Sequence, residues 1–534
     1  MFQMARILPL IACGLFAGPT LAQSNAEADL YAVGDLIGGA LQVEVEGSAP
    51  NSITYLLPSL DLAGSNYLVG LSGDPNDVLT VGIGLAQGGT LFTERADASG
   101  KTSFALTVPN IPTLLDQKIY FQAFSVTGAT TFEKFSNTAT ISVNQPNRWQ
   151  SLDNSPVPVA NLAFLIDSFA ADGSARSAFL CGGGPYLLTD ELTPYPTENR
   201  AWRYDAVKEE FTVMGDTMQD GRAFHNAVQL QDGRIMVCGG VQGPYGTGPY
   251  HTAILDTVEI FDPVTETWSN AAPLSIPRAG STANLLPDGR VLVAGGTKGD
   301  GQNRLFSVDD LLTTSLRTTE IYDPVSNTWS AGPNMSEPKA GAVSVMLDNG
   351  EVMIAGGVTF QSIFGIPIPD FSEKVVFYDP AGNSFRTRSM REKRALFGMV
   401  KLADGRVLIA GGGGGDILNI GPIKKTEIYD PVADNFTNLA LLNTAVAFSG
   451  CVALPDGRAV IVGGASGDLD DPIPVNDVWV FDPNGDTITA IAPMQATHGG
   501  QATLATINGN ITVISGESNS GTAEAVSESL TPGP

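Results

Sequence analysis

Histidine, cysteine and basic residues are scarce in this chain. Of 534 residues, three are histidine, four are cysteine and 29 are lysine or arginine, against 56 aspartate and glutamate residues. The formal net charge of −27 argues against nucleic acid and anionic membranes as partners, because both bind a basic protein face. No stretch after residue 22 is long and apolar enough to span a bilayer. The excess of acidic over basic residues mainly indicates a protein that is soluble outside the cell.

Residues 1–22 have the pattern of a signal peptide. Arg6 gives a positive start, Ile7–Phe16 is apolar, and Thr20-Leu21-Ala22 is a small-residue cleavage site. The stretch Leu10–Cys13 also matches a lipoprotein box, so lipidation at Cys13 stays open. We expect a secreted, periplasmic or cell-surface protein.

The exported chain would keep three cysteines, Cys181, Cys238 and Cys451. An odd number leaves at least one thiol unpaired. Cys181 and Cys238 each precede a diglycine at equivalent places in neighbouring repeats. Such places are usually too far apart for disulfide geometry, so we expect both residues to act as small apolar core residues.

A diglycine recurs at one place inside a larger repeat, and its seventh copy has become Ser515-Gly516. The second glycines are separated by 57, 56, 61, 55, 52 and 52 residues. The first six copies are Gly182-Gly183, Gly239-Gly240, Gly295-Gly296, Gly356-Gly357, Gly411-Gly412 and Gly463-Gly464. A fixed period of this size means one supersecondary unit repeated in an array.

Each repeat predicts four short strands. Apolar runs flank an Asp-Gly or Asn-Gly, as at Asp232-Gly233, which predicts a two-residue hairpin with positive φ at both turn positions. A variable loop follows the diglycine, then a third strand ending in Asp-Pro, such as Thr257–Pro263. The fourth strand opens on an aromatic residue, such as Trp268 or Trp329. Four strands in about 50 residues are typical of a β-propeller blade.

These features resemble the kelch repeat family over about residues 147–534. The resemblance implies an all-β protein with a seven-bladed kelch-type β-propeller. The seventh repeat lacks a fourth strand, and Trp149 stands where Trp268 and Trp329 stand in theirs. We therefore expect a strand at 149–152 to complete the last blade and close the ring, which would remove open strand edges.

Residues 23–146 lack the diglycine repeat and hold short alternating apolar runs separated by turn residues. This spacing predicts a β-sandwich, Ig-like but without a cysteine pair. It loosely resembles accessory β-sandwiches of exported bacterial proteins. The segment Asn144–Asn147 is the expected joint.

The kelch resemblance raises the question of catalysis. Enzymes similar to galactose oxidase need two histidines, two tyrosines and a cysteine around copper, and one of those histidines comes from a domain after the propeller. Here His225, His251 and His498 are scattered over three different contexts. We expect no metal set, no cofactor and no catalytic residues. Propellers similar to sialic-acid mutarotases, which use arginines and a carboxylate at a central pocket, remain the alternative.

Strand parity indicates where a ligand would bind. Loops between strands two and three, and between blades, lie on one face, which we call the long-loop face; the tight turns lie on the other. The long loops carry aromatic and basic residues on a rigid scaffold, where binding is common. The candidates are Tyr186, Tyr245, Tyr250 and Arg304. The alternative is that such aromatics only pack their own loops.

Basic residues recur just before the first strand of successive blades: Arg222, Arg278, Lys339, Arg394 and His498, with Asn443 assigned to the same place in blade six. A basic ring could hold an anionic sugar or acidic peptide. The other interpretation is structural, with guanidinium groups joining blades through backbone carbonyls.

One acidic loop is a weak calcium candidate, with Asp468, Asp470 and Asp471, but it lacks EF-hand spacing. Together these patterns favour an exported, non-catalytic protein that binds another protein or an extracellular glycan.

Overall fold

The computed structural model describes residues 28–532 except for 35, 37–38, 61–64, 69–77, 82–91, 128–130, 170–173, 188–194, 244–251, 300–313, 364–365, 417–418 and 469–470. Over these residues the chain is all-β, with one short 3-10 helix at Pro112–Leu114 and no α-helix. No described segment therefore forms a helix that is long and apolar enough to cross a bilayer. The expected signal peptide lies outside the described residues.

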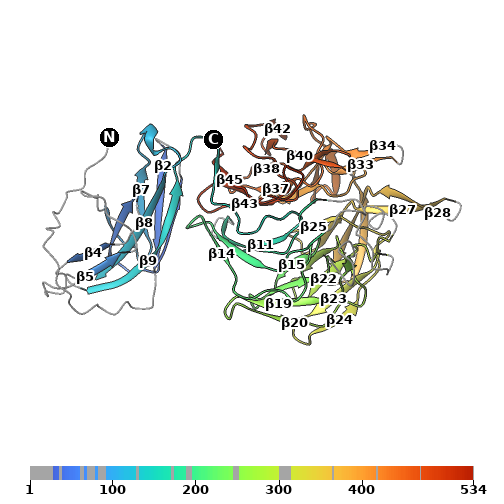
Figure 1. The fold of residues 1–534 in the computed structure, drawn as a ribbon, viewed down its shortest axis with the longest axis horizontal. Helices are drawn as coiled ribbons and strands as arrows, with labels where there is room; N and C mark the ends of the chain where they lie inside the picture. Colours follow the sequence, from blue (N-terminus) through green and yellow to red (C-terminus); the bar gives the residue numbers. More distant parts are fainter. Residues whose placement is uncertain are drawn as a thin grey trace.

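The N-terminal region contains two antiparallel sheets that form a sandwich (Figure 1). The first has the order β1-β2-β7 and the second β6-β3-β8-β9, with β4-β5 as a separate hairpin. Leu30, Leu41 and Val43 of the first sheet share one apolar core with Phe121 and Ile141 of the second. The bounds are β1 Asp29–Val33, β2 Ala40–Glu46, β3 Ile53–Ser59, β4 Ser65–Leu68, β5 Val78–Val81, β6 Phe92–Arg95, β7 Thr102–Thr107, β8 Lys118–Thr127 and β9 Thr131–Ser142.

The rest of the chain forms seven four-stranded antiparallel sheets, the blades of a propeller. First strands of successive blades contact one another around the axis. Blades 1 to 3 contain β11 Ala163–Phe169, β12 Ala175–Cys181, β13 Ala201–Asp205 and β14 Glu210–Val213; β15 Asn226–Gln229, β16 Ile235–Cys238, β19 Val258–Asp262 and β20 Thr267–Asn270; β21 Thr282–Leu285, β22 Val291–Ala294, β23 Thr319–Asp323 and β24 Thr328–Ala331.

Blades 4 to 6 have the same strand order. They contain β25 Val343–Met346, β26 Val352–Ala355, β29 Lys374–Asp379 and β30 Ser384–Ser389; β31 Gly398–Lys401, β32 Val407–Ala410, β35 Thr426–Asp430 and β36 Asn435–Asn438; β37 Gly450–Ala453, β38 Ala459–Val462, β41 Val478–Asp482 and β42 Thr487–Ala490.

Blade 7 is built from two distant parts of the chain. β43 Ala502–Ala505, β44 Ile511–Ile514 and β45 Ser527–Leu530 are followed in the sheet by β10 Trp149–Ser151. Trp149 pairs with Leu530, and its indole nitrogen donates to the Ala492 carbonyl at 2.9 Å. The strand before blade 1 thus closes the ring.

The Asp-Gly turns differ from the two-residue hairpin predicted from the sequence. Only the glycine has positive φ (Gly233, 88°), and the turn closes by hydrogen bonds between Leu230 and Arg234 and from Gly233 to Leu230. This is a three-residue loop with glycine in the left-handed position. The Asp232 carboxylate accepts the backbone N–H of Arg234 at 3.1 Å, which favours aspartate without requiring it to be left-handed.

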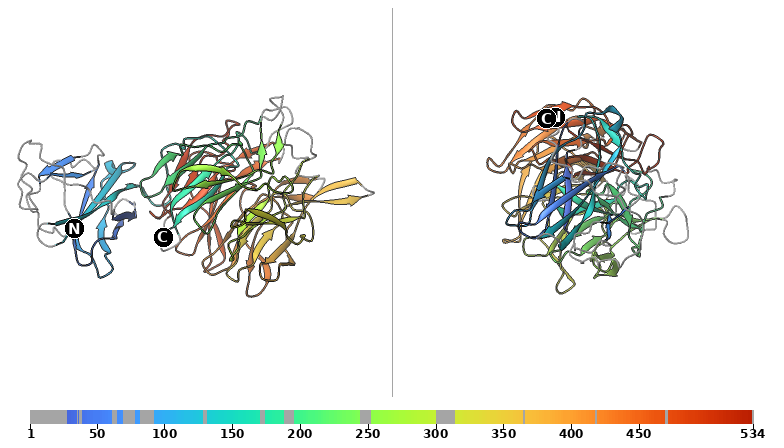
Figure 2. Two further views of the ribbon diagram at one scale, coloured as in Figure 1. Left: turned by 90° about the horizontal axis from the view of Figure 1, so that it is seen from below. Right: turned by 90° about the vertical axis from the view of Figure 1, so that its left-hand side faces the viewer.

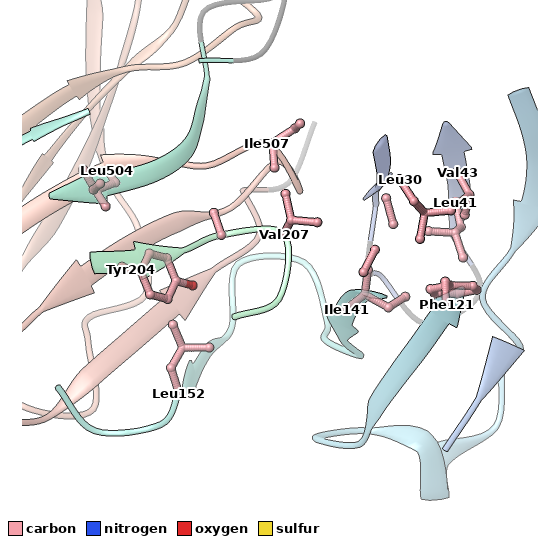
Figure 3. Close-up of a cluster of buried hydrophobic side chains, with 14 of the residues drawn as sticks. Leu30, Leu41, Val43, Phe121, Ile141, Leu152, Tyr204, Val207, Leu504 and Ile507 are labelled. Atoms are coloured by element: carbon pink, nitrogen blue, oxygen red, sulfur yellow. The ribbon is translucent and has the colours of Figure 1, made fainter. Parts of the chain in front are cut away.

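The N-terminal sandwich packs against blades 1 and 7 on the short-turn face. Val207 and Ile507 of the propeller lie opposite Leu30 and Ile141 of the sandwich (Figure 3). The Thr140 backbone donates to Val207 at 2.7 Å. Val207 occupies the same turn position as Val264, yet it is 6% exposed whereas Val264 is 89% exposed. The sandwich therefore covers this part of the short-turn face.

Candidate functional site

The segment that enters each blade has one common geometry. A residue four positions before the first strand is followed by a small residue and then by a residue with positive φ. We call the first of these the entry position. Its seven occupants, in blade order, are Val159, Arg222, Arg278, Lys339, Arg394, Val446 and His498.

In blades 2, 3 and 5 the entry arginine is paired with a glutamate of the third strand. The Arg222–Glu259 distance is 2.6 Å, Arg278–Glu320 is 2.9 Å and Arg394–Glu427 is 2.6 Å, and all three guanidinium side chains are 0% exposed. Each guanidinium also donates to the carbonyl of the first glycine in its own blade. Each glutamate accepts backbone N–H groups from the entry segment. Every one of these buried charges is therefore paired with an opposite charge, although the Nε atoms of Arg222 and Arg394 have no hydrogen-bond partner.

Blade 4 uses a lysine in the same place. The Lys339 Nζ donates to the carbonyls of Gly356 and Lys374 at 2.8 and 2.7 Å, and Glu337 lies 3.3 Å away. Burial lowers the pKa of Lys339 to about 8, against the opposing effect of Glu337.

Blade 7 uses a histidine. His498 is 1% exposed, its Nδ1 lies 2.7 Å from the Ser515 carbonyl, and its Nε2 lies 3.2 Å from a Glu528 carboxylate oxygen. Both ring nitrogens therefore face an acceptor, one a backbone carbonyl and the other a carboxylate.

In blades 1 and 6 the entry residue is valine and the third strand carries tryptophan in place of glutamate. Val159 packs in one cluster with Trp202, and Val446 in another with Trp479. The assignment of Asn443 to the blade 6 entry position was therefore wrong. The Val446 carbonyl makes the equivalent hydrogen bond, while Asn443 accepts the Trp479 indole N–H at 2.6 Å. Because valine replaces the basic residue at the blade 6 entry position, the search for a polar residue selected Asn443, three positions before Val446.

The bonds between blades come from the backbone of the entry position. In all seven blades the N–H of the second diglycine residue donates to the entry carbonyl of the next blade, as in Gly240 to Arg278 at 2.7 Å and Gly516 to Val159 at 2.9 Å. The guanidinium groups bond carbonyls of their own blade, so they do not join blades as one sequence interpretation supposed. Their contacts and complete burial support a structural role over a ligand-binding one.

A ring of backbone hydrogen bonds surrounds the axis beside the first strands. Its members all have positive φ: Asn161, Phe224, Gly280, Gly341, Leu396, Phe448 and Gly500. In six of the seven the N–H donates to the carbonyl of the preceding member, with distances of 2.7–3.2 Å. Among these described residues, the step from Gly500 to Phe448 has no such bond. Bulky residues in this conformation are strained and require firm support from their surroundings.

The long-loop face carries two-stranded hairpins between the second and third strands. They are β17 Val241–Gln242 with β18 Ala253–Ile254, β27 Val358–Ile363 with β28 Ile366–Phe371, β33 Gly413–Asp416 with β34 Asn419–Pro422, and β39 Ala465–Gly467 with β40 Pro472–Pro474. β28 contacts β33, and β34 contacts β39. The β27–β28 hairpin projects beyond the blades (Figures 1 and 2).

Tyr186 is half-buried, and its ring centroid lies 6.3 Å from that of the buried Tyr195. The Tyr195 hydroxyl donates to the Tyr186 carbonyl, so these aromatics pack their own loop, as the alternative interpretation expected. The neighbouring Glu517 accepts the Leu187 backbone N–H, and burial raises the pKa of its carboxyl. No described carboxyl combines a raised pKa with an arginine within 4 Å on this face.

Several candidates lie outside the described residues: Tyr245, Tyr250, His251, Arg304 and Asp470. Asp468 and Asp471 flank the tip of the β39–β40 hairpin and are exposed. Over the described part of the chain, no group of three or more His, Cys, Asp or Glu side chains is placed to hold a metal.

The described cysteines are free thiols. Burial raises the pKa of Cys181 to about 12, and its sulfur lies 3.4 Å from the His225 Nε2. Burial, with the charge of Arg222, holds the pKa of His225 well below its ordinary value. Both partners are thus neutral, so this buried pair is not an activated thiolate.

The seven blades and their entry segments define an all-β propeller protein. Comparison with known proteins indicates which type of repeat forms the blades. The Kelch motif matches residues 222–275 and 282–336. Alpha-scruin of Limulus polyphemus is 25% identical over 283 residues, covering 52% of this chain and 27% of its own. Kelch-like protein 23 of Homo sapiens is 24% identical over 311 residues, covering 57% of this chain and 47% of its own. These findings support a kelch-repeat protein.

The chain spans between about a quarter and about half of the length of these relatives. Among solved structures, a novel fungal alcohol oxidase of the AA5 family in complex with copper is similar, with a TM-score of 0.52 and 19% identity. The likeness covers 72% of this chain and 76% of the oxidase. At this identity it shows a shared fold alone.

Proposed function

We propose that this chain is an exported, non-catalytic protein whose propeller binds a protein or an extracellular glycan on its long-loop face. The proposal includes a signal peptide at 1–22, an accessory sandwich at 23–146 and a propeller at 147–534. The observation that carries it is the contrast between faces. Hairpins of different lengths extend the long-loop face, whereas the opposite face has short turns partly covered by the sandwich. Kelch propellers are typical protein-binding modules, which supports this reading.

The test is binding by the purified chain on a glycan array and against candidate extracellular proteins. Replacing Tyr245 and Tyr250 with alanine should reduce the binding free energy of the ligand by about 1–3 kcal/mol if either residue is an anchor. As matched controls, Asp404→Ala and Asp456→Ala change short turns, where each carboxylate accepts a backbone N–H and an arginine side chain. These two should lower stability and leave affinity intact. Loss of binding from the turn variants alone, at full thermal stability, would reverse the assignment of faces.

The alternative is an enzyme acting on sugars, mutarotase-like or, less favoured, galactose-oxidase-like. The oxidase structure with the similar fold is the observation that keeps it open. Adding copper to the purified chain should give neither a radical absorbance nor oxidation of galactose. A copper-dependent oxidation would replace the binding proposal with the enzyme.

A further inference from the structure

A groove of about 360 Å³ lies on the propeller rim between blades 4 and 5. It is lined by Arg388, Ser389, Met390, Arg391, Asp434, Asn435 and Phe436. It is separate from the central axis and from the hairpins considered above. Its volume falls within the range of small-molecule sites, about 300–1,000 Å³.

Two local differences from blades 2 and 3 lie at this groove. In blades 3 and 7 a tryptophan at the start of the outer strand donates its indole N–H to the end of the preceding blade, as Trp329 does to Ala272 at 2.7 Å. Phe436 holds that place in blade 5 and is smaller. The connection from blade 4 is also shorter, since Phe385 precedes Arg394 by nine positions whereas Trp268 precedes Arg278 by ten.

The groove has a local excess of positive charge in a chain of net charge −27. Asp434 is held by Arg386 at 3.0 Å and by Arg388 at 2.5 Å, and Arg386 also pairs with Glu351 at 2.6 Å. Burial opposes ionisation of Asp434, but hydrogen bonds from Tyr429 and Arg388 keep the pKa of its carboxyl below the ordinary value. The acid of the groove is therefore already neutralised.

Arg391 supplies the free donors. Its Nε donates to the Phe436 carbonyl at 3.1 Å and its backbone N–H to Glu427 at 2.7 Å, which fixes the side chain. Its two terminal nitrogens have no hydrogen-bond partner among the described residues, and the side chain is exposed. The exposed side chains of Ser389 and Asn435 stand beside it, over buried Met390 and Phe436.

We propose that this groove binds the carboxylate of an acidic sugar, a uronate residue of a polysaccharide. The planar Arg391 fork matches a carboxylate with two parallel hydrogen bonds. The Asn435 amide and the Ser389 hydroxyl provide hydrogen-bond partners for the ring hydroxyls of a sugar. A peptide carboxylate would use the arginine but would leave these neutral donors without a role. The site adds to the proposed long-loop function and does not depend on it.

The test is calorimetric titration of the full chain with an oligogalacturonate, with a neutral oligogalactose and hexaglutamate as comparison probes. Arg391→Ala should weaken oligogalacturonate binding at least tenfold, whereas Arg234→Ala, which removes the same charge from a blade 2 turn, should not change it. Phe436→Trp should fill the groove with the side chain found in blades 2, 3 and 7, and should abolish binding without lowering the melting temperature.

Failure of the wild-type chain to bind oligogalacturonate would overturn the proposal. So would equal binding of the neutral sugar, preference for hexaglutamate, or full binding by Phe436→Trp. Tyr245→Ala and Tyr250→Ala should leave this binding intact, so failure here is distinguishable from failure of the long-loop proposal.

Discussion

Blades 3 and 6 fill the same position with opposite chemistry. In blade 3 the buried pair is Arg278 with Glu320, and in blade 6 it is Val446 with Trp479. The entry carbonyl accepts the same backbone hydrogen bond at 2.7 Å in both. The propeller geometry thus requires that the space behind the entry segment be filled, and it accepts either a charged or an apolar pair. A buried ion pair is typically replaceable as a unit but costly to break.

Breaking one pair should have the largest effect. Arg394→Val would leave Glu427, which is 0% exposed, without its cation. We expect the free energy of unfolding to fall by about 3–5 kcal/mol, measured by urea unfolding followed by tryptophan fluorescence. Arg234→Val, at an exposed turn, is the control and should cost no more than about 1 kcal/mol. A loss of similar size in both variants would remove the distinction between buried and exposed arginines.

Exchanging both residues of a pair should restore most of the stability that the single substitution removes. Arg278→Val alone should destabilise blade 3 by about 3–5 kcal/mol, and adding Glu320→Trp should bring stability to within about 1.5 kcal/mol of wild type. A double-mutant cycle measures the coupling. Additive losses would mean that blades 3 and 6 are not interchangeable at this position.

In blade 4, the contribution of the buried Lys339 to the free energy of unfolding should depend on pH. The folded pKa of Lys339 is about 8, below the ordinary value of 10.5. Between these values the unfolded chain keeps a proton that the folded chain loses, so the free energy of unfolding rises with pH. The gain, lost again as pH falls through 8, is on the order of 1 kcal/mol per pH unit. Glu337 and Lys374 face the amine, and both remain in the control variant.

Lys339→Arg is that control, because arginine keeps its proton throughout this range. Wild type should gain stability over the variant when denaturation is compared at pH 8 and pH 10. A constant difference between the two would show that Lys339 stays charged in the folded protein.

Blade 7 should show the smallest effect. His498→Arg places the residue of blades 2, 3 and 5 opposite Glu528, which already occupies the third-strand glutamate position. We expect a change of less than about 1 kcal/mol in the free energy of unfolding at neutral pH, by calorimetry or urea titration. A loss near that of Arg394→Val would show that blade 7 cannot accept the arginine–glutamate geometry of blades 2, 3 and 5.

The blades could be predicted because the backbone requires glycine at fixed places and favours aspartate or asparagine before the turn glycine. Gly240 needs positive φ and has no room for a Cβ, which would come within 2.7 Å of the Ala223 carbonyl. The prediction of a two-residue hairpin was wrong because Asp-Gly is compatible with both two-residue and three-residue loops. A glycine with positive φ occurs in both, so the sequence does not distinguish them. The charged entry residues stood out in the sequence, whereas Val159 and Val446 looked like ordinary core residues.

Contacts across long distances gave no local signal. Val207 and Val325 occupy the same turn position, yet they are 6% and 96% exposed because only Val207 meets the sandwich. The rim groove also has no motif in the sequence, because its lining combines residues of β30, the connection after it and β36.

The pairing of Trp149 with Leu530 also sets the order of events during synthesis. The strand at 149–151 is made before any blade, yet its partner at 527–530 emerges after six blades have been completed. Closure is therefore a contact of very large sequence separation, and contacts of that kind form slowly because the loop entropy must be overcome first. A growing chain would carry this strand unpaired until residues 527–530 have been made, so we expect the closure of the ring to be the slow phase of refolding.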